Sequence, residues 1–140
     1  MIASRCLIAA LCVVPLVSVS ARAQQTMEPA RVAAVAAGRA TFRQFCSPCH
    51  GVDARGDGPV GRLLLAKPSD LTHVAQRNHG QFPKDRITEA LSVGVRMETE
   101  AHGSDQMPIW GPVFRTIDSS PEQVAQRIDN LIAYLESIQE

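Results

Sequence analysis

The sequence predicts a single all-α domain with long loops, and three observations support this fold class. A chain of 140 residues is long enough for one hydrophobic core rather than two. Apolar residues recur with helical spacing, most clearly near the C-terminus, whereas no stretch alternates apolar and polar residues as a strand does. Only six residues are aromatic, so something other than large side chains is expected to fill the centre.

Charge and composition exclude two classes of protein. Fourteen Lys and Arg residues balance fourteen Asp and Glu residues, so the chain lacks the basic excess that is typical of a nucleic-acid-binding protein. Hydrophobic residues make up 45% of the chain, which distinguishes it from a disordered polar tract.

The first 23 residues have the features of an export signal. Arg5 supplies a positive charge, residues 6–19 are almost wholly apolar, and residues 21–23 read Ala-Arg-Ala, the pattern that signal peptidase recognises. The alternative is an uncleaved membrane anchor, but an apolar run of about 14 residues is shorter than the roughly 20 that a spanning helix needs. The sequence therefore predicts a periplasmic protein, cleaved before Gln24, with no membrane span in the mature chain.

The predicted domain occupies residues 30–140 and follows a short flexible lead-in at residues 24–29. Its first helix is expected over residues 30–46, where apolar side chains recur at intervals of three and four. Glycine-rich turns are expected over residues 51–59, and a short helical turn over residues 61–66.

Two more helices are predicted in the second half of the chain. A middle helix over residues 83–93 is expected to begin at Pro83 and to stop at Gly94. Residues 95–113 have no convincing period and are expected to form an ordered loop. The last helix has Ser120 as its N-cap, Pro121 as its first residue and Gln123 as the partner in a capping box. Its apolar face consists of Val124, Ile128, Leu131, Leu135 and Ile138.

One motif carries the chemistry. Residues 46–50 read C-x-x-C-H, the attachment signature of c-type haem. On a helical turn, residues three apart lie on the same side, so the thiols of Cys46 and Cys49 can each form a thioether with a vinyl group of one haem. His50 follows directly and can supply an imidazole nitrogen to the iron.

Other uses of two cysteines at this spacing are less consistent with the chain. A thioredoxin-like redox pair needs a preceding strand and a parallel sheet, and here a helix precedes the motif. A structural zinc site needs four ligands, and the remaining histidines have no regular spacing. A structural disulfide between residues three apart is rare. The motif therefore favours haem attachment.

The iron of such a haem has a second face, which needs its own ligand. Met107 is the favoured candidate, because Pro108 prevents helix formation and stiffens the loop that holds the thioether. His102 is the rival ligand, and Met97, close to the end of the middle helix, is expected to pack against the core or to lie at the surface. His73 and His79 complete the set of candidates.

Together these residues resemble the class I cytochrome c family, and the resemblance extends over nearly the whole predicted mature chain. Gly38 and Phe42 stand before the C-x-x-C-H motif at the family's spacing, and residues 107–111 match the M-P-x-W-G distal loop of many bacterial members. Leu131 and Tyr134 resemble the pair on the family's last helix that meets this glycine and phenylalanine. The resemblance implies that the two helices cross closely at Gly38, with the two aromatic rings stacked.

The resemblance also implies a cytochrome c fold, three main helices with short helical turns and long loops around one covalent haem, and roles for single residues. His50 would be the proximal ligand and Met107 the distal ligand. A proline carbonyl in the family accepts the Nδ1 proton of the proximal histidine, a role that suits Pro59 best, with Pro68 as its rival. Trp110 would donate its indole N–H to a haem propionate, or simply pack in the core. Residues 98–105 do not align with the family pattern.

The predicted function is one-electron transfer in the periplasm, without a catalytic residue. One haem c per chain would exchange electrons with a donor and an acceptor protein, either as a mobile carrier or as the cytochrome subunit of a redox complex. The alternative, if Met107 is a labile ligand, is a haem peroxidase or a gas sensor.

Overall fold

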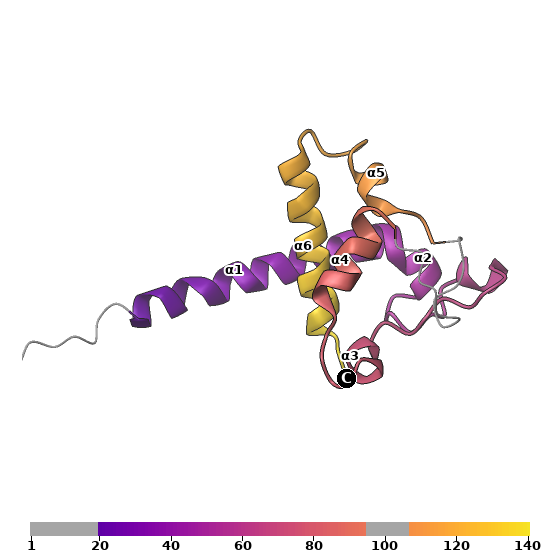
Figure 1. The fold of residues 1–140 in the computed structure, drawn as a ribbon, viewed down its shortest axis with the longest axis horizontal. Helices are drawn as coiled ribbons and strands as arrows, with labels where there is room; N and C mark the ends of the chain where they lie inside the picture. The colour runs from indigo at the N-terminus through magenta and orange to yellow at the C-terminus, as the bar shows by residue number, and fades with distance from the viewer. Residues whose placement is uncertain (1–19, 95–106) are drawn as a thin grey trace, which may run out of the picture.

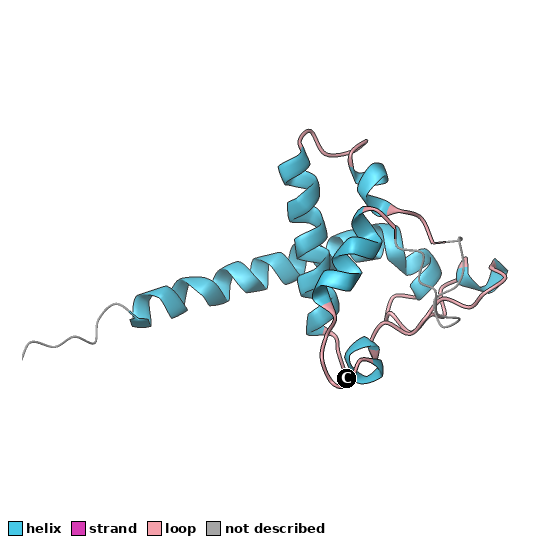
Figure 2. Cartoon of the chain, in the orientation of Figure 1, coloured by secondary structure: helices cyan, strands magenta, loops and turns pink. Residues whose placement is uncertain are grey.

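The computed structural model describes residues 20–94 and 107–140, with side chains from Glu28 onward (Figure 1). All regular secondary structure in these residues is helical, which confirms the all-α prediction (Figure 2). Three of the helices have seven or more residues. Within the described ranges, no helix combines the length and the apolar character needed to cross a membrane. The elements are α1 (Ser20–Thr41), η1 (Phe42–Cys46), α2 (Ser47–His50), η2 (Gly61–Leu63), α3 (Val74–Arg77), α4 (Lys84–Ser92), α5 (Trp110–Phe114) and α6 (Pro121–Ser137).

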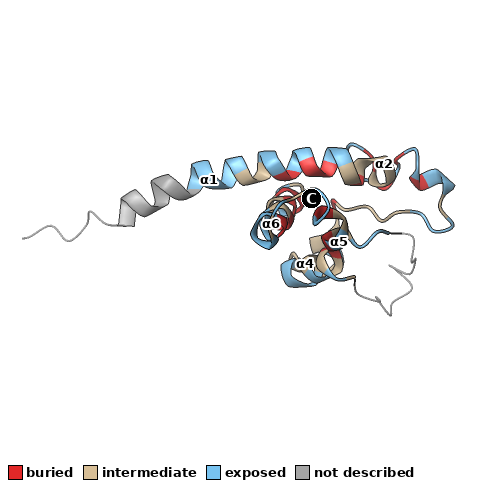
Figure 3. Cartoon of the chain, turned by 90° about the horizontal axis from the view of Figure 1, so that it is seen from above, coloured by how far each residue is buried: buried red, intermediate tan, exposed pale blue. Residues whose placement is uncertain are grey.

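The first helix is longer than the sequence predicts. It begins at Ser20 rather than at residue 30 and includes residues 24–29, so the predicted flexible lead-in is helical in the structure. Alanine, glutamine, arginine and methionine dominate this stretch and favour a helix, and Pro29 is accommodated within it. Figures 1 and 3 show this first half of α1 projecting away from the other helices. Among the side chains of α1 that the structure describes, residues 28–33 are exposed and Val35 in the second half packs against the core.

The core centres on the crossing of α1 and α6. At Gly38, an added Cβ would lie 1.8 Å from the carbonyl oxygen of Asn130 and 2.9 Å from the Cβ of Tyr134, so only glycine allows this approach. One turn later the rings of Phe42 and Tyr134 lie with centroids 5.2 Å apart and planes at 48°. The expected contact at the crossing is present, but the rings are tilted rather than stacked. Leu131 beside them is fully buried.

The start of α6 follows the predicted capping pattern. Ser120 is the N-cap, and its hydroxyl accepts the backbone N–H of Gln123 at 3.3 Å. The side-chain oxygen of Gln123 accepts the N–H of Ser119 at 2.8 Å, so the return bond reaches the residue before the cap. These bonds satisfy N–H groups that a helix start leaves without intrahelical partners. The buried face of α6 consists of Val124, Ile128, Leu131, Ile132, Tyr134 and Leu135.

Removing the cap hydroxyl should weaken this helix by a modest amount. We expect Ser120→Ala to lower the free energy of unfolding by about 1 kcal/mol, because one N–H loses its acceptor. Urea unfolding of the purified protein measures the loss. Ser119→Ala is the matched control, since Gln123 contacts only its backbone N–H. Equal losses in the two variants would show that the Ser120 hydroxyl does not cap α6.

The helices α4 and α5 meet through a second close approach. The helix α4 lies within the predicted range and follows Pro83. The helix α5 begins inside the segment 95–113 that the sequence predicts to be a loop, and it ends one residue beyond that segment. A helix of five residues is too short to show a period, and Pro112 fits its first turn because the N–H groups there have no intrahelical partner. At Gly111 an added Cβ would lie 2.1 Å from the carbonyl oxygen of Ser92, so α5 begins directly against the end of α4.

An ion pair holds the connection between α5 and α6. The guanidinium of Arg127 donates two hydrogen bonds to the Asp118 carboxylate, at 2.8 and 2.6 Å. These bonds hold the pKa of Asp118 below its ordinary value. The same guanidinium lies 5.5 Å from the ring centroid of Phe114. Residues 114–127 are thereby closed into a loop that keeps α5 beside α6.

Candidate functional site

The C-x-x-C-H motif continues the first helix through a wide turn. The N–H of Ser47 bonds to the carbonyl of Phe42, five residues earlier, as in a π-helix. Pro48 has no N–H and so cannot make the α-helical bond to Gln44, which favours this wider turn. The hydroxyl of Ser47 donates to the Arg43 carbonyl at 2.6 Å. The chain therefore passes from α1 into α2 without a break.

The two thiols lie on this helical turn in different environments. The Cys46 side chain is buried and that of Cys49 is half-buried, and neither is in a disulfide. Burial, together with the nearby Cys49, raises the pKa of Cys46 to about 12. A charged thiolate is therefore disfavoured at this position, whereas a thioether is uncharged and suits an apolar environment. The burial of Cys46 fits the covalent attachment of an apolar group.

The ring of His50 is oriented by one hydrogen bond. Its Nδ1 lies 3.0 Å from the backbone carbonyl oxygen of Ser69. A carbonyl can only accept, so Nδ1 carries the proton, and Nε2 of the neutral ring keeps its lone pair for a metal. Burial lowers the pKa of His50, an effect that the bond to Ser69 partly opposes. The neutral ring, with a fixed tautomer, suits an iron ligand.

The acceptor of the His50 proton differs from the predicted one. The glycine-rich segment turns back along α2, where Gly56 N–H donates to the His50 carbonyl at 2.7 Å and Gly58 N–H to the Cys49 carbonyl at 3.1 Å. This return satisfies carbonyl groups at the end of α2 and leaves Pro59 exposed on the turn. The predicted role of Pro59 as acceptor was therefore wrong. Its rival Pro68 directly precedes the true acceptor, Ser69.

Backbone contact places Ser69 opposite the histidine. At Gly56, whose φ is +77°, an added Cβ would lie 2.1 Å from the carbonyl oxygen of Pro68. The N–H of Leu71 also donates to the Ala54 carbonyl at 2.7 Å. The sequence offers no direct signal for Ser69, because the functional group is a backbone carbonyl and any residue type carries one.

An aromatic cluster brings the M-P-x-W-G segment to the C-x-x-C-H segment. Trp110 stacks on Phe114, with centroids 5.6 Å apart, and meets the edge of Phe45 at 5.7 Å. Phe45 and Phe114 are themselves 5.4 Å apart. Because Phe45 directly precedes Cys46, the cluster joins the two motifs. Trp110 thus packs in the core, the alternative left open for it, and its bond to a propionate stays a prediction.

The candidates for the distal ligand lie in different parts of the chain. Met107 precedes α5 by three residues and is 47% exposed. The other candidates Met97 and His102, and the segment 98–105, lie outside the described residues. His73 lies near the C-terminus, where its Nδ1 is 3.3 Å from a carboxylate oxygen of Asp70. His79 is exposed in a turn with φ of +56°. The ligand role of Met107 stays a prediction.

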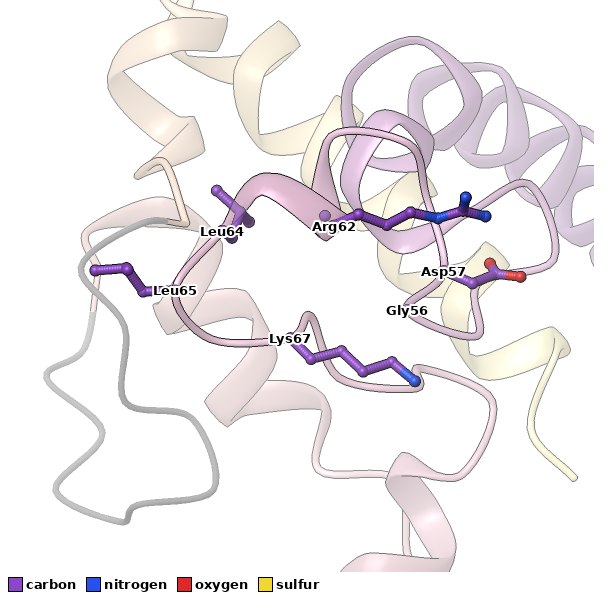
Figure 4. Close-up of a pocket in the computed structure, with 7 residues that line it drawn as sticks. Gly56, Asp57, Arg62, Leu64, Leu65 and Lys67 are labelled. Atoms are coloured by element: carbon purple, nitrogen blue, oxygen red, sulfur yellow. The ribbon is translucent and has the colours of Figure 1, made fainter.

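The loop at residues 56–67 presents leucines to its surroundings. Leu63 is 84% exposed and Leu65 is 97% exposed. Figure 4 shows Leu64 and Leu65 on one side of this loop, with Asp57 and Arg62 directed to the other. Two exposed leucines this close together in one loop are unusual for a folded chain and fit a protein that encloses a large apolar group. The loop also lines a pocket of about 430 Å³, formed by Gly56, Asp57, Gly61, Arg62, Leu64, Leu65 and Lys67.

Comparison with known proteins identifies the type of domain. A protein-family model described as cytochrome c matches residues 35–139, which is well over half of the chain. The matched region contains the C-x-x-C-H motif, the Ser69 acceptor and the helices α4 to α6. Comparison with curated proteins and with solved structures gave no match.

Proposed function

The chain belongs to the cytochrome c family, and from this premise we propose that it is a periplasmic one-electron carrier with one haem c, attached through Cys46 and Cys49. Family membership implies haem-based electron transfer, and members are typically electron carriers rather than enzymes. We further propose His50 and Met107 as the axial ligands. One observation carries the proposal: the bond from His50 Nδ1 to Ser69 leaves Nε2 free to bind iron, directly beside two thiols that can form thioethers.

The residues of the chain would keep the site unchanged during electron exchange. When bound, the haem supplies an iron that cycles between the ferric and ferrous states. The Ser69 carbonyl holds the His50 ring in one orientation, so the same nitrogen faces the iron in both states. The aromatic cluster of Phe45, Trp110 and Phe114 contributes an apolar environment next to Cys46. Such an environment and a methionine ligand both favour the ferrous state and raise the reduction potential.

Export and partners complete the proposal. Residues 1–23 have the signal-peptide pattern, with Arg5 before an apolar run and Ala-Arg-Ala at its end. The proposed partners are a redox protein that donates the electron and one that accepts it, docked weakly and briefly through a small interface. The chain would act either as a mobile carrier or as the cytochrome subunit of a larger oxidoreductase.

A second function is favoured by the position of Met107. Its 47% exposure is consistent with a ligand that leaves the iron readily. An iron with one open face could bind peroxide or a diatomic gas, giving a peroxidase or a sensor. The two functions differ in the spectrum of the resting ferric protein, which is low-spin for a carrier and high-spin for an open site.

The Met107→Ala variant tests the proposed carrier. We expect the purified ferric protein to show the charge-transfer band of methionine sulfur on iron, and Met107→Ala to lose this band completely and to have a lower reduction potential. Met97→Ala is the matched control, since Met97 is the rival methionine, and it should keep the band. Loss of the band in Met97→Ala instead would reassign the ligand, and a high-spin spectrum of the unaltered protein would favour the peroxidase or sensor.

A further inference from the structure

We propose that Gln139 is a positioning residue for His50, acting through residues 69–75, which carry the Ser69 carbonyl. This inference rests on the proposed function, in which His50 binds the haem iron. The connection is long in sequence but short in space: Figure 1 shows the C-terminus beside α3, at the end of this segment.

The carboxamide of Gln139 binds three backbone groups. Its Oε1 accepts the N–H of Ala75 at 2.8 Å, and its Nε2 donates to the carbonyls of Leu71 at 2.8 Å and Leu135 at 2.7 Å. The partners also fix the orientation of the amide, because the N–H of Ala75 must face an oxygen and the two carbonyls must face an NH₂ group. One side chain therefore ties both ends of residues 71–75 to the end of α6.

Glu140 adds two more attachments to the same segment. Its backbone N–H donates to the Thr72 carbonyl at 2.9 Å. Its carboxylate pairs with Arg55, and a second carboxylate oxygen lies 3.8 Å from Nε2 of His73. Arg55 follows Ala54, whose carbonyl accepts the Leu71 N–H, so the C-terminal residues also reach the loop that follows His50.

Residues 69–75, which include Ser69, are thus held from two sides. The loop after His50 holds residues 69–75 through the hydrogen bond between the Ala54 carbonyl and the Leu71 N–H, and through the close approach of Gly56 to Pro68. Gln139 and Glu140 hold it from the end of α6. Within the segment, the Asp70 carboxylate accepts hydrogen bonds from the N–H and the hydroxyl of Thr72, and α3 begins only at Val74. These bonds join neighbouring residues of the segment and do not attach it to the rest of the fold. The position of the Ser69 carbonyl, and with it the bond to His50, therefore depends on the C-terminal residues.

This dependence has a direct consequence for the iron ligand. A firm Nδ1–H···O=C bond makes the imidazole a stronger donor to iron and favours the ferric state. Releasing the segment would lengthen or open this bond. The reduction potential should then rise, and the Nδ1 proton should exchange with solvent more readily.

The neutral variant Gln139→Met tests this in the haem-loaded protein. The side chain keeps its length but loses all three hydrogen bonds. NMR of the reduced protein should show faster solvent exchange of the Ala75 amide, which reports release of the segment. The His50 Nδ1 proton should exchange about fivefold to tenfold faster, as expected when a hydrogen bond of ordinary strength is lost. The midpoint potential should shift upward.

Two controls separate positioning from general stability. Gln123→Met makes the same substitution at the other end of α6, and Val124→Ala removes buried methyl groups there without contact to residues 69–75. Both should leave the His50 exchange rate and the potential unchanged. The proposal would be overturned if Val124→Ala changed the His50 exchange rate and the potential as much as Gln139→Met does. It would also be overturned if the Ala75 amide exchanged faster in Gln139→Met while the His50 exchange rate stayed unchanged. If Gln139→Met does not accumulate, Gln139→Asn, which is shorter by one methylene, provides the same test.

Failure of this inference is distinguishable from failure of the proposed function. An unaltered protein without covalent haem, or one whose His50 gives no iron-ligand signal, would overturn the proposed function. A normal unaltered protein combined with an unresponsive Gln139→Met variant would overturn the positioning role alone.

Discussion

Replacing both Cys46 and Cys49 with alanine should give a chain that carries no covalent haem and does not fold. The described hydrophobic core is formed mainly by residues of η1, α4, α5 and α6, with Val35 of α1 packed against it. Residues 51–73 contain only the short η2 helix and expose the leucines at positions 63 and 65. Loops of this length need an organiser, which we propose to be the haem held by the two thioethers.

Mass spectrometry under denaturing conditions and circular dichroism together measure this outcome. The unaltered protein should retain the mass of haem after denaturation, whereas the double variant should lose it and show a large drop in helix signal. The single variants Cys46→Ala and Cys49→Ala should keep one thioether each and fall between these limits. Cys12→Ala, within the predicted leader, is the matched control and should change neither signal. A haem-free double variant with full helix content would contradict the proposed role of the haem.

The second large effect is expected at Gly38. Alanine is more favourable than glycine inside a helix by about 1 kcal/mol, so helix propensity alone predicts that Gly38→Ala stabilises α1. The structure predicts the opposite, because the new Cβ would lie 1.8 Å from the Asn130 carbonyl oxygen. Backbone on both helices must then move apart and release the contact of Phe42 with Tyr134. We expect a net loss of about 3 kcal/mol in the free energy of unfolding.

Denaturant unfolding of the haem-loaded Gly38→Ala variant measures this loss. Ala37→Val, at an exposed neighbouring position of the same helix, adds methyl groups without a clash and should change stability by no more than about 0.5 kcal/mol. A more stable Gly38→Ala variant would show that α1 and α6 do not approach closely at this residue.

Local patterns in the sequence were sufficient to predict several elements of the fold and of the candidate site. The face of α6, its cap at Ser120 and the range of α4 follow from periodicity and from residues that begin or end helices. The C-x-x-C-H motif places its thiols and histidine on one helical turn because its spacing is itself local. These features involve residues a few positions apart, so the order of residue types is enough to predict them.

Other features depend on residues that are distant in sequence. Ser69 acts through its own backbone carbonyl on the ring of His50, 19 positions away. Gln139 binds backbone groups of Ala75 and Leu71, 64 and 68 positions away. The short helix α5 is stabilised by contacts of Trp110 and Gly111 with other elements rather than by its own period. No residue type identifies such a contact, since any residue carries a backbone carbonyl.

The sequence by itself therefore determined the helical class, the thiol pair of Cys46 and Cys49, and His50 beside them. Only the tertiary structure decided that the Ser69 carbonyl, and not that of Pro59, orients the His50 ring, and that the C-terminal residues hold the segment with this carbonyl. The physical reason is that attachment chemistry is specified by side chains at fixed spacing. The orientation of a ring is instead set by where the folded backbone places one acceptor.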